Sequence, residues 1–74
     1  MKISTWNVNS VNARIEHLEK FLKKDQSDIY LLQELKTIED GFPNQIIKNI
    51  GYHSYVNGQK AWNGVAILSK DKLE

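Results

Sequence analysis

Residues 2–33 decide the fold of this chain, and they read KISTWNVNSVNARIEHLEKFLKKDQSDIYLLQ. Residues 2–8 are rich in β-branched and aromatic types, which predicts a strand. Residues 29–32 are apolar without interruption, a pattern typical of strands that are buried on both faces in a parallel sheet. Because a helical pattern separates the two segments, we expect a βαβ unit with parallel strands and a right-handed crossover.

The segment between these strands has the pattern of an amphipathic helix. Asn9 and Ser10 are types that favour helix N-caps, so the helix is expected to begin after them. It is expected to end near Lys24, where Lys23 and Lys24 suit the negative end of the helix dipole. The apolar positions that recur at helical spacing are Val11, Ile15, Leu18 and Leu22.

The rest of the chain predicts a second, short helix and two more strands. The helix is expected to start at Pro43, which suits a first turn, and to end at Gly51. Residues 52–56 and 64–69 predict strands, with Asn57-Gly58 as a hairpin-type turn signal between them. The helix positions expected to face inward are Ile46, Ile47 and Ile50. The pattern as a whole predicts an α/β protein.

The composition limits the kinds of protein this chain can be. It has 74 residues, room for one small domain at most, and a formal net charge of +1, which does not indicate nucleic-acid binding. There is no cysteine, which excludes disulfides and suits a reducing compartment. No stretch is apolar enough to span a membrane and the N-terminus does not resemble a signal peptide, so the expected location is the cytoplasm.

Polar side chains follow the first two predicted strands. Asn7 lies at the end of the first strand and Glu34 directly after the second. In an open α/β sheet, ligands bind beyond the carboxyl ends of parallel strands, so both residues are expected at one edge of the sheet. A carboxylate there can hold a hard cation such as Mg²⁺, and an amide can orient that carboxylate or a phosphate oxygen. The commoner roles of such residues are a solvated loop acid and a turn former.

The loop of the predicted hairpin contains Lys60 and Trp62. A lysine beside an aromatic side chain can contact a phosphate backbone and a base face. An ordinary polar hairpin tip, with Trp62 folded back on the sheet, explains the same residues equally well. His17 and His53 are far apart in the sequence and no cysteine accompanies them, which argues against a zinc site.

Four stretches resemble the motifs of one enzyme family. Residues 2–10, 31–36, 58–60 and 64–70 read KISTWNVNS, LLQELK, GQK and GVAILSK. In this order and spacing they resemble bacterial exodeoxyribonuclease III and the related apurinic/apyrimidinic endonucleases, within the endonuclease/exonuclease/phosphatase superfamily. The resemblance runs from end to end of the chain, and several ordered motifs are more specific than any single one.

The resemblance implies a fold, an activity and a set of site residues. The family fold is a four-layered α/β sandwich, of which residues 1–74 would form the N-terminal β-α-β-α-β-β portion within one domain. Its members cleave the phosphodiester next to an abasic site in double-stranded DNA, and many remove nucleotides from 3′ ends, with Mg²⁺ or Mn²⁺ as cofactor. The implied roles are catalytic for Asn7 and Glu34, metal-binding for Glu34, supporting positions near the metal for Asn9 and Lys36, and a place in a DNA-facing loop for Lys60. Trp62, in the same loop, and Arg14, near position 12, are the other residues expected to contact DNA.

The chain departs from the family pattern in two respects. Asn12 stands where the family usually has a basic residue that touches the DNA backbone. The family's catalytic tyrosine, its aspartate–asparagine pair that orients the attacking water and its late aspartate–histidine pair have no counterpart in these 74 residues. We therefore expect an N-terminal fragment that binds Mg²⁺ weakly and does not cleave DNA alone, with the missing C-terminal portion as a partner.

Two other interpretations stay open. A related phosphatase of the superfamily, such as a sphingomyelinase or an inositol phosphatase, would share Asn7 and Glu34, although the GQK motif at residues 58–60 favours the DNA enzymes. A non-enzymatic module that binds another protein is the alternative from a different class. It is suggested by several strands with apolar faces and only two helices, a pattern that leaves hydrophobic surface uncovered.

Overall fold

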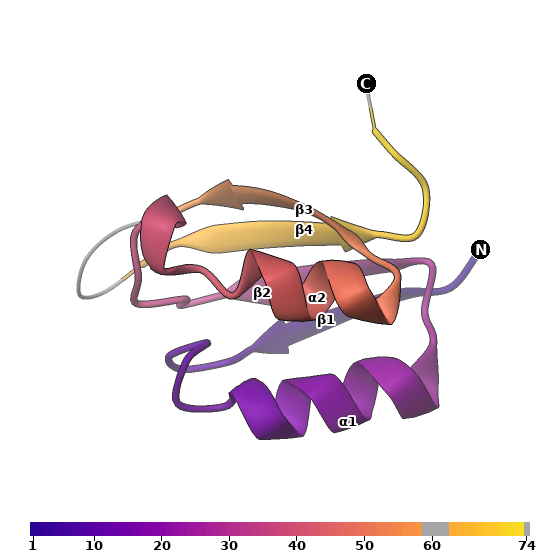
Figure 1. Ribbon diagram of the computed structural model, residues 1–74, viewed down its shortest axis with the longest axis horizontal. Helices are drawn as coiled ribbons and strands as arrows, with labels where there is room; N and C mark the ends of the chain where they lie inside the picture. The colour runs from indigo at the N-terminus through magenta and orange to yellow at the C-terminus, as the bar shows by residue number, and fades with distance from the viewer. Residues whose placement is uncertain (59–62, 74) are drawn as a thin grey trace.

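The structure, a computed structural model, describes residues 1–58 and 63–73, which form one mixed sheet and two helices (Figure 1). In chain order the elements are β1 (Ile3–Asn7), α1 (Ile15–Asp25), β2 (Ile29–Gln33), the 3₁₀ turn η1 (Glu39–Gly41), α2 (Asn44–Ile50), β3 (His53–Asn57) and β4 (Val65–Ser69). Neither helix in these ranges has the length and apolar composition needed to cross a membrane.

The strand order of the sheet is β1-β2-β4-β3. β1 and β2 are parallel, and β4 is antiparallel to both β2 and β3. The predicted α/β class and the βαβ unit with parallel strands are therefore confirmed. In Figure 1 both helices lie on one side of the sheet, and the loops that follow β1 and β2 lie at its left end. Both chain termini and the C-terminal ends of both helices lie at the right end.

α1 begins later than the sequence predicts. Its N-cap is Arg14, which makes no side-chain capping bond, whereas Asn9 and Ser10 lie in the preceding loop with φ of 46° and 81°. A capping residue normally has an extended backbone, so the prediction that Asn9 and Ser10 cap the helix is wrong. The helix ends at Asp25, close to the predicted end, and Gln26 follows in a left-handed conformation with φ of 53°.

α2 follows the prediction at both ends but not along its whole length. Pro43 occupies the cap position, and Gly51, with φ of 108°, ends the helix by donating its N–H to the Ile47 carbonyl. Ile47 is fully buried and Ile50 is half-buried, but Ile46 is 37% exposed. The prediction that all three face inward is wrong for Ile46, because neighbouring helix residues point about 100° apart and a short helix buries only one stripe.

β3 and β4 form the predicted antiparallel hairpin. Asn57 pairs with Val65, so each strand lies within one residue of its predicted position. A Cβ added at Gly58 would lie 2.4 Å from the carbonyl oxygen of Thr37. A side chain at position 58 would therefore clash with the loop that follows β2, and glycine is needed there.

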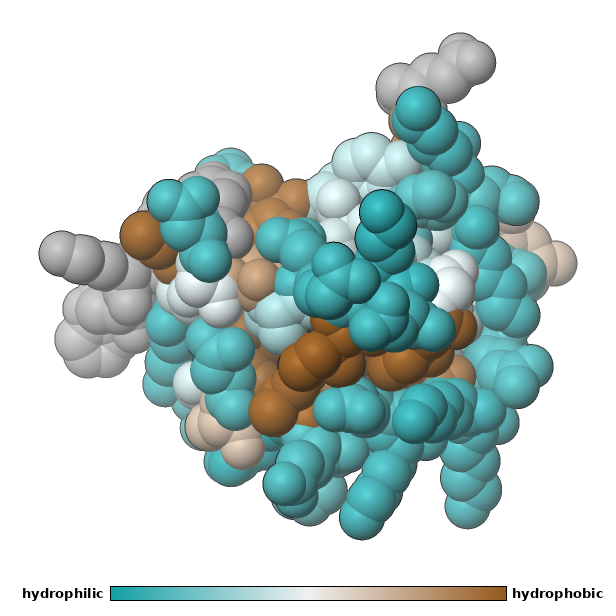
Figure 2. All heavy atoms as spheres, viewed as in Figure 1, coloured by the Kyte–Doolittle hydropathy of each residue, from teal (hydrophilic) through white to brown (hydrophobic). Residues whose placement is uncertain are grey.

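One face of the sheet packs against the helices and the other is open. The buried core is Val8, Val11, Leu18, Leu22, Tyr30, Leu32, Leu35, Phe42, Ile47, Tyr52, Ala66 and Leu68. On the open face Leu31 and Ile67 are 38% and 37% exposed. The prediction that these apolar runs are buried on both faces is wrong in this chain, whereas the predicted uncovered apolar surface is confirmed. The helix side is mostly polar, with an apolar strip between the two helices (Figure 2).

Candidate active site

The parallel pairing of β1 with β2 brings two predicted site residues together. Asn7, the last residue of β1, lies opposite Gln33, the last residue of β2. Glu34 follows directly, and Nδ2 of Asn7 donates a hydrogen bond to Oε2 of Glu34. The structure thus places Asn7 and Glu34 at one edge of the sheet, as the βαβ pattern predicts, while their chemical roles stay predictions.

Hydrogen bonds continue beyond the strand ends and join three loops. On one side the Ser10 N–H donates to the carbonyl of Glu34 over 2.9 Å. On the other side the Lys36 N–H donates to the carbonyl of Asn63 over 3.0 Å. Because the loop after β2 is bonded on both sides, the side chains that it presents at this edge are held in place.

Four residues of this edge have a left-handed backbone although none of them is glycine. The φ angles are 46° at Asn9, 81° at Ser10, 53° at Glu34 and 56° at Lys36. This conformation costs a residue with a Cβ atom roughly 1–2 kcal/mol, with asparagine among the types that tolerate it best. Such backbone strain is concentrated at functional sites in proteins. Sequence patterns did not indicate it, because no glycine marks the positions.

Asn7, Asn9, Glu34 and Lys36 form one connected group, which we call the polar edge. The Asn9 N–H donates to Oδ1 of Asn7 over 3.1 Å, and Nζ of Lys36 donates to Oδ1 of Asn9. All four residues are exposed or half-buried, so a ligand from solvent can reach them. The structure therefore brings together every predicted catalytic, metal-binding and supporting residue.

The residues predicted to contact DNA are placed less completely. Arg14 is exposed at the start of α1, and within residues 1–58 and 63–73 its side chain makes no hydrogen bond or ion pair with the polar edge. Lys60 and Trp62 lie outside the described residues. Asn12 donates from Nδ2 to the carbonyl of Gly41 over 3.1 Å, so it ties the loop after β1 to η1.

The polar edge suits a hard cation but supplies few ligands for it. Mg²⁺ prefers oxygen and commonly uses one or two carboxylates together with water and substrate phosphate. Glu34 provides a carboxylate, while the side-chain oxygens of Asn7 and Asn9 already accept hydrogen bonds. In the part of the chain that the structure describes, no three His, Cys, Asp or Glu side chains gather as a metal site. The residues therefore fit a Mg²⁺ ion whose other ligands are waters and phosphate oxygens.

Comparison with models of known protein families shows which family the chain belongs to. The model described as the Endonuclease/Exonuclease/phosphatase family matches residues 4–74. The chain belongs to the endonuclease/exonuclease/phosphatase family. This confirms the family that the ordered sequence motifs indicate.

Relatives in this family include named DNA-repair enzymes. The chain is 42% identical over 72 residues to Exodeoxyribonuclease III of Haemophilus influenzae, covering 97% of this chain and 27% of that protein. It is 35% identical over 75 residues to DNA repair nuclease APEX1 of Danio rerio, covering 95% of this chain and 24% of that protein. The chain thus spans about a quarter of the length of these two relatives.

Solved structures of the family agree with the fold. An AP endonuclease from Archaeoglobus fulgidus matches with a TM-score of 0.94 and 40% identity, covering 97% of this chain and 28% of that one. The 3′ phosphatase NExo from Neisseria, bound to a product DNA hairpin, matches with a TM-score of 0.91 and 47% identity, covering 95% and 27%. The chain has the fold of the N-terminal part of the endonuclease/exonuclease/phosphatase domain, as predicted.

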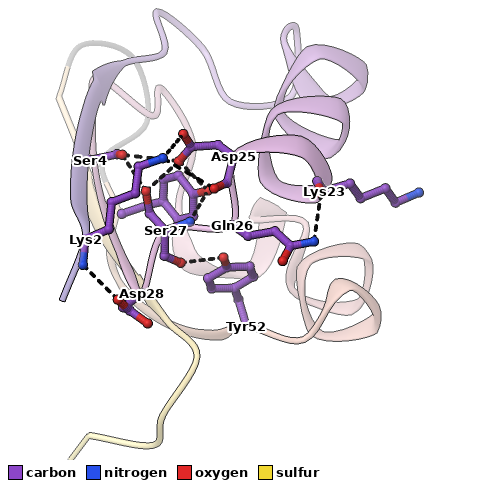
Figure 3. A network of polar contacts seen from close by, with 9 residues as sticks. Lys2, Ser4, Lys23, Asp25, Gln26, Ser27, Asp28 and Tyr52 are labelled. Carbon is purple, nitrogen blue, oxygen red and sulfur yellow. Dashed lines mark hydrogen bonds and ion pairs between the residues drawn. The ribbon is translucent and has the colours of Figure 1, made fainter.

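At the opposite end of the sheet, this family member has a polar cluster that the sequence did not predict (Figure 3). We call it the Asp25 network, and its residues are Lys2, Ser4, Asp25, Ser27, Tyr30 and Tyr52. The Asp25 carboxylate accepts hydrogen bonds from Lys2 Nζ over 2.6 Å and from the hydroxyls of Tyr30 and Ser27. The hydrogen bond from Lys2, followed by that from Ser27, holds the pKa of Asp25 well below its ordinary value.

Aromatic side chains connect the Asp25 network to the core. The Tyr52 hydroxyl donates to the Ser27 carbonyl, and burial raises the pKa of Tyr52 above its ordinary value. The rings of Tyr52 and Tyr30 pack edge to face with centroids 5.3 Å apart, and Phe21 continues the series from Tyr30 to Trp6 at 5.6 and 5.8 Å. Such edge-to-face pairs stabilise beyond the area they bury, so the aromatic series strengthens the core on which the Asp25 network rests.

Proposed function

We propose that this chain contributes the metal-binding edge of a Mg²⁺-dependent DNA-repair nuclease, as the N-terminal part of one domain. The reaction is hydrolysis of a DNA phosphodiester next to an abasic site or at a 3′ end. The observation that carries the proposal is the contact between the Asn7 amide and the Glu34 carboxylate at adjacent strand ends. It occurs in a chain 42% identical to a protein named Exodeoxyribonuclease III.

Glu34 would hold the metal ion, Mg²⁺ or Mn²⁺, and Asn7 would orient the Glu34 carboxylate or a phosphate oxygen. When bound, a divalent cation neutralises phosphate charge and lowers the pKa of a coordinated water. Lys36 would keep Asn9 in place through the bond from its ammonium group. Mg²⁺ sites commonly use one or two protein carboxylates, and Glu34 supplies one, so the free chain should bind Mg²⁺ weakly.

The proposed substrate is double-stranded DNA. A structural relative of this chain, NExo from Neisseria, was solved with a product DNA hairpin. Arg14 and Lys60 would neutralise phosphates of the backbone, and Trp62 would stack on a base or sugar. Since the net charge is only +1, attraction to DNA depends on where these cations lie and not on the overall charge.

Hydrolysis requires more groups than the polar edge offers. An activated water, a stabilised leaving group and charge neutralisation act together in phosphodiester cleavage. One carboxylate and one amide do not supply all three, so further polypeptide is the proposed partner. We therefore expect the chain alone not to cleave an abasic duplex at a useful rate.

The proposal is tested by a chimera in which residues 1–74 replace the matching segment of Haemophilus influenzae Exodeoxyribonuclease III. We expect Mg²⁺-dependent cleavage of an abasic duplex, reduced by about 10²-fold or more in Glu34→Gln. Glu16→Gln is the matched control, because it makes the same chemical change in the first turn of α1. A folded chimera that keeps its full rate with Glu34→Gln would show that Glu34 does not serve the reaction.

The same chimera separates the alternatives. A phosphatase-type segment would leave the chimera inactive on DNA, although the chimera folds. A protein-binding module is favoured by the open sheet face, where Ile3 and Val65 are 58% and 51% exposed. In that case Glu34→Gln would change neither partner binding nor stability. The predicted cytoplasmic location stays a prediction.

A further inference from the structure

The two polar atoms of the Asn7 side chain have partners that require one orientation of its amide. Oδ1 accepts the main-chain N–H of Asn9 over 3.1 Å, and Nδ2 donates to the carboxylate of Glu34. With the amide turned over, Nδ2 would face a donor and Oδ1 would face an acceptor, so both contacts would become repulsive. We propose that residue 9 is a positioning residue that acts through its main chain, by holding the Asn7 amide with its NH₂ group toward Glu34.

A left-handed turn aims the N–H of residue 9. Asn9 and Ser10 have φ of 46° and 81°, and the Ser10 N–H donates to the main-chain carbonyl of Glu34 over 2.9 Å. Glu34 is therefore bonded through its backbone to this turn and through its carboxylate to Asn7. The contacts close a ring that runs from Asn7 through residues 9 and 10 to Glu34 and back. Because the ring is closed, the turn and the amide orientation depend on each other.

The role of this hydrogen bond in catalysis rests on the proposed function, but the geometry of the bond does not. The amide orientation decides whether Asn7 presents a donor or an acceptor to the Glu34 carboxylate. A donor supports the ionised carboxylate that a metal ligand must be, whereas an acceptor would repel it. Residue 9 would thus maintain the metal ligand without touching the metal or the substrate.

The Asn9 side chain offers a competing explanation, since its Oδ1 accepts a hydrogen bond from Lys36. The two explanations predict different effects of the Asn9→Gly and Asn9→Ala substitutions. If the main chain matters, Asn9→Gly keeps the turn, because glycine adopts positive φ freely, while Asn9→Ala disfavours it about 5- to 30-fold. If the side chain matters, the glycine and alanine variants lose the contact with Lys36 equally and behave alike.

The first measurement is NMR of the side-chain amide of Asn7 in the 74-residue chain, without metal or DNA. We expect two well separated proton signals that exchange slowly with water, because one proton is bonded to Glu34. Asn9→Gly should retain both features, and Asn9→Ala should exchange about 5- to 30-fold faster. Loss of the signals in Asn9→Gly, or equal behaviour of the glycine and alanine variants, would overturn the proposal.

A second measurement tests the proposal even if the Asn9→Ala variant does not fold. In Asn7→Ala the main-chain N–H of Asn9 loses its acceptor, so its hydrogen exchange should accelerate about tenfold, whereas that of Ser10 should accelerate less because the Glu34 carbonyl still accepts it. Unchanged exchange at Asn9 in this variant would overturn the proposal. Both measurements are made without metal and DNA. A negative result in them would therefore overturn the role of residue 9, whereas an inactive chimera would count against the proposed function alone.

Discussion

The polar edge and the Asp25 network lie at opposite ends of one sheet and are built in opposite ways. At the polar edge the side chains are exposed or half-buried, and Asn9, Glu34 and Lys36 have left-handed backbones. In the Asp25 network Tyr30 and Ser27 are fully buried, and every buried side-chain polar atom in the described residues has a partner. One end contains strained, accessible polar groups, and the other contains polar groups that are paired with one another around the buried Ser27 and Tyr30. The comparison teaches that the second end stabilises the scaffold on which the first end is held.

The largest effect on stability should come from the Asp25 network. Tyr30→Phe leaves the Ser27 N–H buried without its acceptor and removes a donor from Asp25, which should cost about 1–3 kcal/mol. Urea unfolding followed by circular dichroism measures this difference. Tyr55→Phe is the matched control, because among the described residues the Tyr55 hydroxyl bonds only the exposed Leu73 main chain, and it should cost less than about 0.5 kcal/mol. Equal losses in the two variants would remove the distinction between the two ends.

Acid should weaken the Asp25 network progressively. The pKa of Asp25 lies below its ordinary value of 3.8, mainly because of the hydrogen bond from Lys2. Below that pH the unfolded chain binds a proton that the folded chain does not, so the contribution of Asp25 is complete above pH 3.8 and is lost as the pH falls further. Asp25→Asn should therefore be less stable than the parent chain at neutral pH and should flatten the acid limb of its stability profile. An acid limb that is identical in both proteins would argue against this role.

At the polar edge, the backbone strain at Lys36 should separate two variants in stability. Lys36 has φ of 56°, so Lys36→Gly relieves backbone strain that Lys36→Ala retains, while both lose the bond to Asn9. The glycine variant should be more stable than the alanine variant by about 1–2 kcal/mol. Thermal or urea unfolding of this pair measures the strain directly. A glycine variant that is no more stable than the alanine variant would mean that the left-handed backbone at Lys36 is not strained.

The smallest stability effect should come from Glu34→Gln. Its carboxylate is half-buried and its one hydrogen-bond partner among the described side chains is Asn7. The free energy of unfolding should change by no more than about 0.5 kcal/mol. A loss as large as that of Tyr30→Phe would mean that Glu34 is part of the scaffold.

Much of the fold follows from sequence periodicity. The strands and both helices were predictable because apolar residues alternate or recur in runs whose period is set by backbone geometry. The meeting of Asn7 with Glu34 was predictable for a related reason, since neighbouring parallel strands end at the same edge. The burial of β2 and β4 on both faces was predicted wrongly, because their open face has no covering layer in this chain.

Other features depend on residue types that suit two structures. Asn9 and Ser10 favour both helix caps and tight turns, so the start of α1 could not be chosen from the sequence. The Asp25 network joins residues 23 positions apart, such as Lys2 and Asp25, and no local pattern links them. Left-handed backbone at Glu34 and Lys36 has no sequence signal, because tertiary hydrogen bonds and not residue type impose it.

The most direct test of the polar edge as the metal site is NMR of the 74-residue chain titrated with Mn²⁺, which broadens signals of nearby nuclei. We expect broadening to centre on Asn7 and Glu34, to require high Mn²⁺ concentrations, and to leave Lys2 and Asp25 sharp. It should disappear in Glu34→Gln and persist in Glu16→Gln. Broadening that centres on Asp25, or that survives Glu34→Gln unchanged, would contradict the assignment of the metal site to the polar edge.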